Sequence, residues 1–161
     1  MAQHYYIISS LPNLDIDSGL IITIQEFLER CKDFLPAKEF NILLKSSISN
    51  PDEKKVHKIN KNFWIWERSL RNHLVTLRAH KMRLDANNYI KKGGDLLEIH
   101  HTAVDAFMKD SPIHAEHVLN NARWDYLENL KTGHYFGFEV LIIYYLKLQI
   151  LQRISHFKVE E

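Results

Sequence analysis

Glycine, proline and cysteine are all scarce in this sequence. The 161 residues include 5 glycines, 4 prolines and 1 cysteine. A sheet-rich domain uses glycine and proline in its many tight turns, so their scarcity favours long helices with few connections. The single cysteine, Cys31, excludes an intramolecular disulfide and is typical of a reducing, cytoplasmic compartment. We interpret Cys31 as a small core residue on the apolar face of a helix.

The sequence also has little net charge and no long hydrophobic run. Its 21 basic and 20 acidic side chains leave a formal charge of +1, which argues against nucleic acid as a partner. The longest apolar run, 140–146, ends at Lys147, well short of the roughly 20 residues that span a bilayer. Residues 1–10 lack the features of a secretory signal. We therefore expect a soluble chain without a membrane span, which docks on a membrane complex, if at all, through partners.

What the sequence does contain is helical periodicity. Apolar residues recur every three or four positions over most of the chain, and neither a repeat nor a linker divides it. We predict an all-α fold, a compact bundle of about five or six helices in a single domain over 1–161. The predicted helices cover approximately residues 23–35, 36–44, 56–81, 96–107, 112–132 and 138–156.

Several residues indicate where these helices begin and end. Thr23 and Glu26 have the spacing of a capping box, and Pro36 ends one helix and starts the next. Ser111 places a capping hydroxyl before a first-turn proline. The basic and glycine residues 91–94 predict the C-terminal turn and cap of another helix.

Two segments have a less usual pattern. Residues His4–Ser9 are aromatic and β-branched and precede turn residues, which predicts a short strand or an extended segment. Residues 140–151 are apolar nearly all round, which is typical of a helix at the centre of a bundle or in an interface.

No catalytic motif is present, and the one hypothesis of a metal site rests on the histidines. The sequence has no Gly-x-Ser-x-Gly, phosphate-binding glycine loop or Cys/His constellation, so we predict no catalytic residues and a non-enzymatic role. It also lacks His-Glu-x-x-His and repeated Glu-x-x-His, so solvated histidines without metal or cofactor are the preferred interpretation. The open alternative is a small metal-dependent helical-bundle enzyme with a cluster of His100, His101, His114 and His117.

Two segments, 64–72 and 122–128, interleave tryptophan with arginine and carboxylates. Such interleaving is typical of hot spots in protein interfaces. The alternative is an internal charge network packed under the tryptophans, in which Glu67 and Arg71 form an i, i+4 salt bridge. The interface candidates are Trp64, Glu67, Arg68, Arg71, Asn72, Arg123, Trp124 and Asp125.

Several motifs in order along the chain resemble one protein family. They are Tyr5–Pro12, Trp66–Asn72, Ala122–Asp125, and Gly133–Phe136 leading to Tyr145–Leu148. Together they resemble a bacterial family of unknown function whose genes lie among those of V-type (V/A-type) ATPase subunits. Their place is roughly where archaeal clusters encode the stalk adaptor, the subunit that seats the central shaft on the membrane rotor ring.

The resemblance implies an all-helical, non-catalytic accessory or stalk/adaptor subunit of a V-type proton- or sodium-translocating ATPase. Its partners would be the soluble subunits of that ATPase, which would hold it peripherally at the inner membrane. The archaeal stalk adaptor is about twice as long and is built from repeated helical units, and no repeat is visible here. The resemblance therefore leaves open whether this family replaces the stalk adaptor, is a trimmed form of it or assists assembly.

Overall fold

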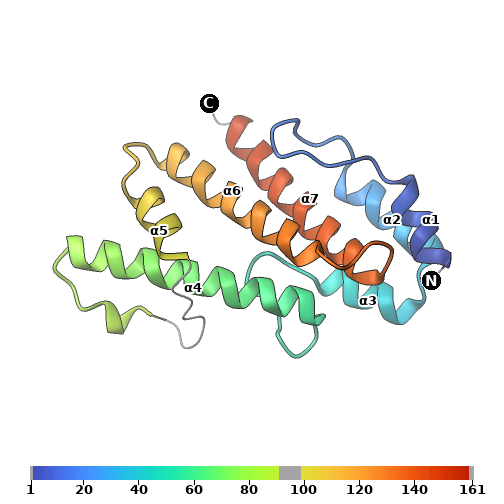
Figure 1. Cartoon of the computed structure of the whole chain (residues 1–161), viewed down its shortest axis with the longest axis horizontal. Coiled ribbons are helices and arrows are strands. Elements are labelled where there is room, and N and C mark those ends of the chain that lie inside the picture. The colour runs from blue at the N-terminus through green and yellow to red at the C-terminus, as the bar shows by residue number, and fades with distance from the viewer. Residues whose placement is uncertain (1, 91–98, 160–161) are drawn as a thin grey trace. The chain divides into compact units, whose positions relative to one another are not determined.

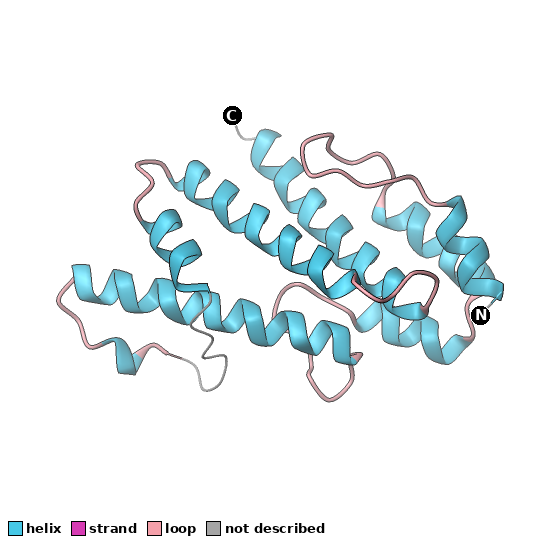
Figure 2. Cartoon of the chain, viewed as in Figure 1, coloured by secondary structure: helices cyan, strands magenta, loops and turns pink. Residues whose placement is uncertain are grey.

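The computed structural model describes residues 2–90 and 99–159, and every regular element in them is helical (Figures 1 and 2). The predicted all-α class is confirmed, with seven α-helices in these residues where about five or six were expected. No helix among them is long and apolar enough to cross a membrane. The elements are α1 (Ala2–Ser10), α2 (Ile24–Phe34), α3 (Ala37–Lys45), α4 (Lys58–Lys81), the 3-10 helix η1 (Ala86–Asn88), α5 (His100–Phe107), α6 (Pro112–Lys131) and α7 (Phe138–Val159).

The contacts divide the chain into two compact units. The first consists of residues 1–61 and 126–161, and the second of residues 62–125. The boundaries fall within α4 and within α6. The single domain over 1–161 stays a prediction.

Helix α7 is the core element of the first unit, where it packs against α1, α2 and α3. All but two of its side chains from Val140 to Leu151 are buried. Phe27 of α2 stacks on the α7 rings of Tyr144 and Tyr145, with ring centroids 5.2 and 5.8 Å apart. The helix that is apolar nearly all round therefore lies at the centre of this unit, one of the two positions that the sequence indicated.

The predicted extended segment at His4–Ser9 is wrong, because these residues belong to α1. Ile7 is almost completely buried, and α1 packs against α2 and α7. Ser10 Oγ donates a 2.7 Å hydrogen bond to the carbonyl oxygen of Ile7, and His4 Nε2 lies 2.7 Å from Glu39 Oε2 of α3. These tertiary contacts override the β propensity of the aromatic and β-branched residues.

The predicted helix boundaries mostly hold. Thr23 and Glu26 form a complete capping box, and α2 ends directly before Leu35 and Pro36. Pro36 stands at the N-cap of α3, one position before the helix proper. Ser111 Oγ accepts a 3.3 Å hydrogen bond from the backbone N–H of Ile113. The predicted basic turn and glycine cap at 91–94 lie outside the described residues.

The amide side chains of the buried Asn60 and the half-buried Gln149 hold the loop between α3 and α4. Asn60 Oδ1 accepts from the Ser47 N–H at 3.0 Å, and Asn60 Nδ2 donates to the Ser47 carbonyl at 2.8 Å. Gln149 of α7 accepts from the Ile48 N–H at 3.1 Å and donates to the Ser46 carbonyl at 3.0 Å. These four bonds satisfy backbone groups of residues 46–48 without helix or strand pairing.

In the second unit, α4 buries an apolar stripe of residues three or four positions apart, as the helical periodicity predicted. Phe63, Trp66, Leu70 and Leu74 all lie in the core. Near the end of α4, Lys81 Nζ lies 5.7 Å from the ring centroid of Phe107 on α5.

Candidate functional site

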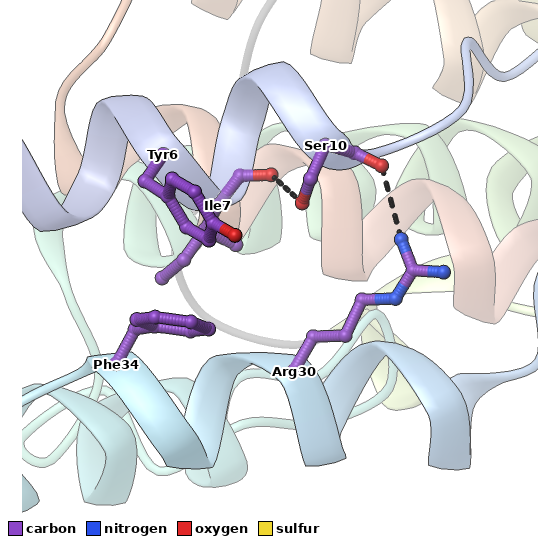
Figure 3. A pocket seen from close by; sticks show the side chains of 5 residues that line it. All are labelled: Tyr6, Ile7, Ser10, Arg30 and Phe34. Carbon is purple, nitrogen blue, oxygen red and sulfur yellow. Dashed lines mark hydrogen bonds between the residues drawn. The ribbon is translucent and has the colours of Figure 1, made fainter.

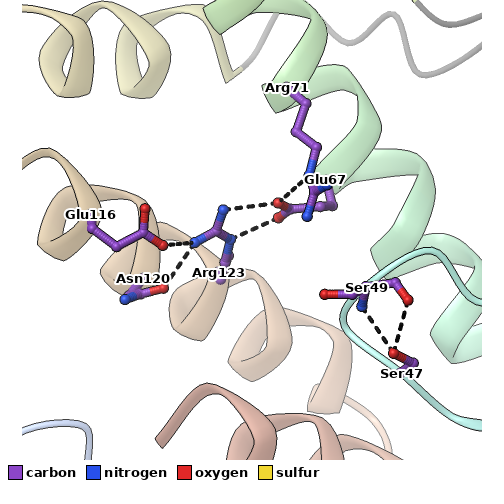
Figure 4. Close-up of polar contacts among 7 residues, drawn as sticks. All are labelled: Ser47, Ser49, Glu67, Arg71, Glu116, Asn120 and Arg123. Atoms are coloured by element: carbon purple, nitrogen blue, oxygen red, sulfur yellow. Dashed lines mark hydrogen bonds and ion pairs between the residues drawn. The ribbon is translucent and has the colours of Figure 1, made fainter. Parts of the chain in front are cut away.

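The centre of the polar network in the second unit is Glu67 on α4 (Figure 4). Its carboxylate accepts two hydrogen bonds from Arg123 on α6, from Nε and from Nη2, each 2.9 Å long. Arg71 Nε donates a third at 3.0 Å. Arg123 Nη1 donates to Glu116 at 2.9 Å and to Asn120 at 2.8 Å. Glu67 and Arg123 therefore form a buried ion pair, and each of the two has at least one further hydrogen-bond partner.

Burial and the neighbouring charges shift the pKa values of Glu67 and Arg123 in opposite directions. Burial alone raises the pKa of Glu67, but the charges and hydrogen bonds of Arg123 and Arg71 hold that pKa below its usual value. Burial alone lowers the pKa of Arg123, and the carboxylates of Glu67 and Glu116 raise it above its usual value. Both groups are therefore charged at neutral pH, and each depends on the other to remain so in the interior.

The structure places the eight interface candidates in different environments. Four are buried: Trp64, Glu67, Arg123 and Trp124 have exposed fractions of 4%, 1%, 4% and 7%. Arg68 and Asn72 are half-buried, and Arg71 and Asp125 are exposed. The guanidinium of Arg71 lies 5.2 Å from the ring centroid of Trp64. The internal network is therefore present, and contact of these residues with a partner stays a prediction.

Two exposed aromatic pairs lie on the first unit. Tyr5 pairs with Phe136 at a centroid distance of 4.9 Å, and Tyr6 pairs with Phe34 at 4.8 Å. Their exposed fractions are 54% for Tyr5, 52% for Phe136, 57% for Tyr6 and 42% for Phe34. We call these four residues the aromatic surface. Large rings that face solvent in fixed pairs are typical of a binding surface.

The local structure explains why these rings remain outside the core. Ile7 is the buried residue of the middle of α1, so the neighbouring Tyr5 and Tyr6 point to other sides of that helix. Phe136 lies in the segment before α7, near His134, whose Nδ1 is 4.0 Å from Glu139 Oε2. Phe34 is the last residue of α2.

Sequence reasoning missed the aromatic surface. Phe34 lies in the predicted helix 23–35, where apolar residues recur every three or four positions, but its ring is exposed. Tyr5 and Phe136 belong to the first and the last of the motifs that carry the family resemblance. The signal that could have found them was the presence of adjacent aromatic residues in these two motifs, but no local pattern indicates that residues so far apart meet.

A cavity of about 220 Å³ lies between α1 and α2, beside the second aromatic pair (Figure 3). Tyr6 and Phe34 form one wall, and Ile7 lies behind them. On the other side, Arg30 Nη1 donates a 3.0 Å hydrogen bond to the carbonyl oxygen of Ser10. Arg30 is the one charged residue among those that line this cavity.

The four histidine candidates are all exposed and lie on two helices. His100 and His101 begin α5, and His114 and His117 are in the first part of α6. The ring of His100 lies 5.8 Å from that of His73, between centroids. Within 2–90 and 99–159, no three or more His, Cys, Asp or Glu side chains are grouped so that they could hold one metal ion. The alternative of a metal-dependent enzyme therefore has no ligand set in this part of the chain.

Burial also shifts the pKa values of Cys31, of the half-buried Tyr144 and of Lys147. Burial raises the pKa of the Cys31 thiol to about 12 and that of the Tyr144 hydroxyl to about 12. Tyr144 donates a 2.7 Å hydrogen bond to the carbonyl oxygen of Pro12. Burial lowers the pKa of Lys147, which pairs with Glu128, to about 8. The thiol and the hydroxyl are therefore neutral at pH 7, as structural groups in a core are.

No protein-family model, curated protein or solved structure matches this chain.

Proposed function

We propose that the chain is a non-catalytic accessory or stalk/adaptor subunit of a V-type (V/A-type) proton- or sodium-translocating ATPase, and that it acts by protein–protein docking. Its partners are the soluble subunits of that ATPase. The chain then works in the cytoplasm and reaches the inner membrane only through these subunits. The support comes from the order of the resembling motifs and from the surface that two of them build.

The contact between Tyr5 and Phe136 carries the proposal. These residues are more than 120 positions apart, yet their rings pair at 4.9 Å while about half of each remains exposed. A core contact would bury both rings, because burial of a large aromatic side chain is favourable by roughly 1.5–3 kcal/mol. Paired rings that keep half of their surface in water leave apolar area that a partner can cover.

The second pair adds exposed aromatic area on the same unit. Tyr6 follows Tyr5 on α1, and its ring meets Phe34 at the end of α2. Aromatic side chains supply a large contact area at low entropic cost and are enriched in protein interfaces. Four such rings around one short helix are suited to docking of a protein surface.

Co-expression tests the proposal. The chain is produced together with the soluble V-type ATPase subunits encoded beside its gene, and the complex is purified through a tag on one of those subunits. We expect the chain to co-purify in a fixed ratio at moderate salt. Recovery of the ATPase subunits without the chain, when the chain itself is soluble and folded, would overturn the proposal.

A further inference from the structure

The cavity between α1 and α2 has the size of one or two side chains. Its volume is about 220 Å³, below the roughly 300–1,000 Å³ of sites for drug-sized ligands. Its wall is formed by the Tyr6 and Phe34 rings, which are 4.8 Å apart between centroids, with Ile7 behind them (Figure 3). Such a space is suited to a single apolar side chain.

The charged side chain beside this apolar wall, Arg30, is positive. Arg30 is exposed, and its hydrogen bond to the Ser10 carbonyl oxygen fixes the guanidinium at the side of the cavity. A guanidinium has five N–H donors in a fork that matches a carboxylate, and this bond uses a donor of Nη1 only. The acidic residues nearest along α2, Glu29 and Asp33, are not among the residues that line the cavity. The cavity therefore combines an apolar wall with a positive side.

We propose that this cavity binds a partner segment in which an apolar side chain lies next to carboxylates, with the apolar group packed against the wall formed by the Tyr6 and Phe34 rings and a carboxylate on Arg30. The inference rests on the proposed docking function and adds the chemistry of the partner. Charge complementarity selects the occupant: a basic segment would place its charge against Arg30 without an acidic group of the cavity to offset it.

Two short peptides that differ only in charge test this proposal. The probes are acetyl-Gly-Phe-Glu-Glu-Gly-amide and acetyl-Gly-Phe-Lys-Lys-Gly-amide, each titrated into the full, ¹⁵N-labelled chain and followed by NMR. We expect the acidic peptide to shift the amide signals of Tyr6, Ile7, Ser10, Arg30 and Phe34 until they saturate. The basic peptide should bind at least about tenfold more weakly, a difference of roughly 1.4 kcal/mol.

Variants separate the two parts of the cavity. Arg30→Gln should weaken the acidic peptide at least about fivefold, while Glu29→Gln, on the same helix and outside the cavity, should leave its affinity unchanged. Tyr6→Ala should weaken both peptides, whereas Tyr6→Phe should retain binding because the ring and not the hydroxyl is needed. The spectrum of each variant also shows whether it is folded.

Three results of the peptide titrations would overturn the inference. They are the absence of saturable shifts at these residues, equal affinity for both peptides, and an unchanged affinity in Arg30→Gln. Shifts of the same signals with the concentration of the chain alone would also overturn it, because a second copy would then be the occupant. The experiment contains no ATPase subunit, so its failure is distinguishable from failure of the co-purification that tests the proposed function.

Discussion

Arg123 donates two parallel hydrogen bonds to Glu67, from Nε to Oε2 and from Nη2 to Oε1, each 2.9 Å long. The two residues are 56 positions apart in sequence and are both buried. Fork-to-fork pairing of this kind is geometrically specific, and in the interior each charge depends on its partner. The pair therefore fixes the register of α4 against α6 in the second unit.

Substitution of Arg123 should lower the free energy of unfolding strongly, and substitution of Arg71 should not. Arg123→Ala leaves Glu67 buried without its main partner, so we expect the free energy of unfolding to fall by about 3–5 kcal/mol. Arg71→Ala removes a half-exposed partner and should cost about 1 kcal/mol or less. Urea denaturation of both variants checks this. A cost below about 1 kcal/mol for Arg123→Ala would contradict the structural role of the network and favour a hot spot instead.

Asn60 should contribute more to stability than an exposed asparagine. Asn60→Ala removes both hydrogen bonds to the Ser47 backbone, and we expect a cost of about 2 kcal/mol because buried polar groups lose their partner. Asn41→Ala on the exposed side of α3 is the control and should change stability by less than about 0.5 kcal/mol. Equal effects of the two substitutions in thermal or urea denaturation would contradict this assignment.

The ionisation of Lys147 should affect how the free energy of unfolding depends on pH. Burial lowers its pKa from 10.5 to about 8, so between these values the unfolded chain holds a proton that the folded chain has released. The contribution of Lys147 to the free energy of unfolding therefore rises as the pH increases from about 8 to 10.5. Relative to Lys147→Met, the wild type should gain about 2 kcal/mol between pH 7 and pH 10.

The comparison with Lys147→Met cancels the opposing ionisation of Cys31, which both proteins share. Lys131→Met, at an exposed lysine, is the control and should show no such gain. If the difference between wild type and Lys147→Met stays flat from pH 7 to pH 10, then Glu128 keeps Lys147 charged and the prediction is wrong.

Cys31 should be unreactive in the folded chain. Its side chain is fully buried and burial raises its pKa to about 12, so the nucleophilic thiolate is absent at pH 7. A thiol-specific disulfide reagent should modify it only at the rate at which the chain opens. Lys32→Cys, one position further along α2 and exposed, should add one thiol that reacts at once. Rapid modification of the wild type would show that Cys31 is accessible.

The parts of the fold that depend on local sequence could be predicted. The capping box of Thr23 and Glu26 and the apolar stripe of α4 each follow from residues within a few positions of one another. The i, i+4 pair of Glu67 and Arg71 is likewise local, and it forms at 3.0 Å.

The parts that depend on distant residues could not be predicted. The aromatic and β-branched composition of residues 4–9 favoured an extended segment, but α1 forms there. Its packing against α2 and α7 involves residues outside this segment, so the segment alone could not indicate it. The two bonds from Arg123 to Glu67 and the pairing of Tyr5 with Phe136 join positions that no periodic pattern relates. For the same reason the sequence left open whether the Trp/Arg clusters form an interface or an internal network, and it did not indicate the exposed ring pairs.

The most direct measurement of docking through the aromatic surface compares affinities of two variants for the soluble V-type ATPase subunits. The double substitution Tyr5→Ala and Phe136→Ala should weaken binding at least about 30-fold, the effect of losing a hot spot worth about 2 kcal/mol. Tyr89→Ala removes a tyrosine of matched exposure, 56%, outside this surface and should change affinity less than about twofold. Equal affinity of both variants and the wild type would contradict docking through the aromatic surface.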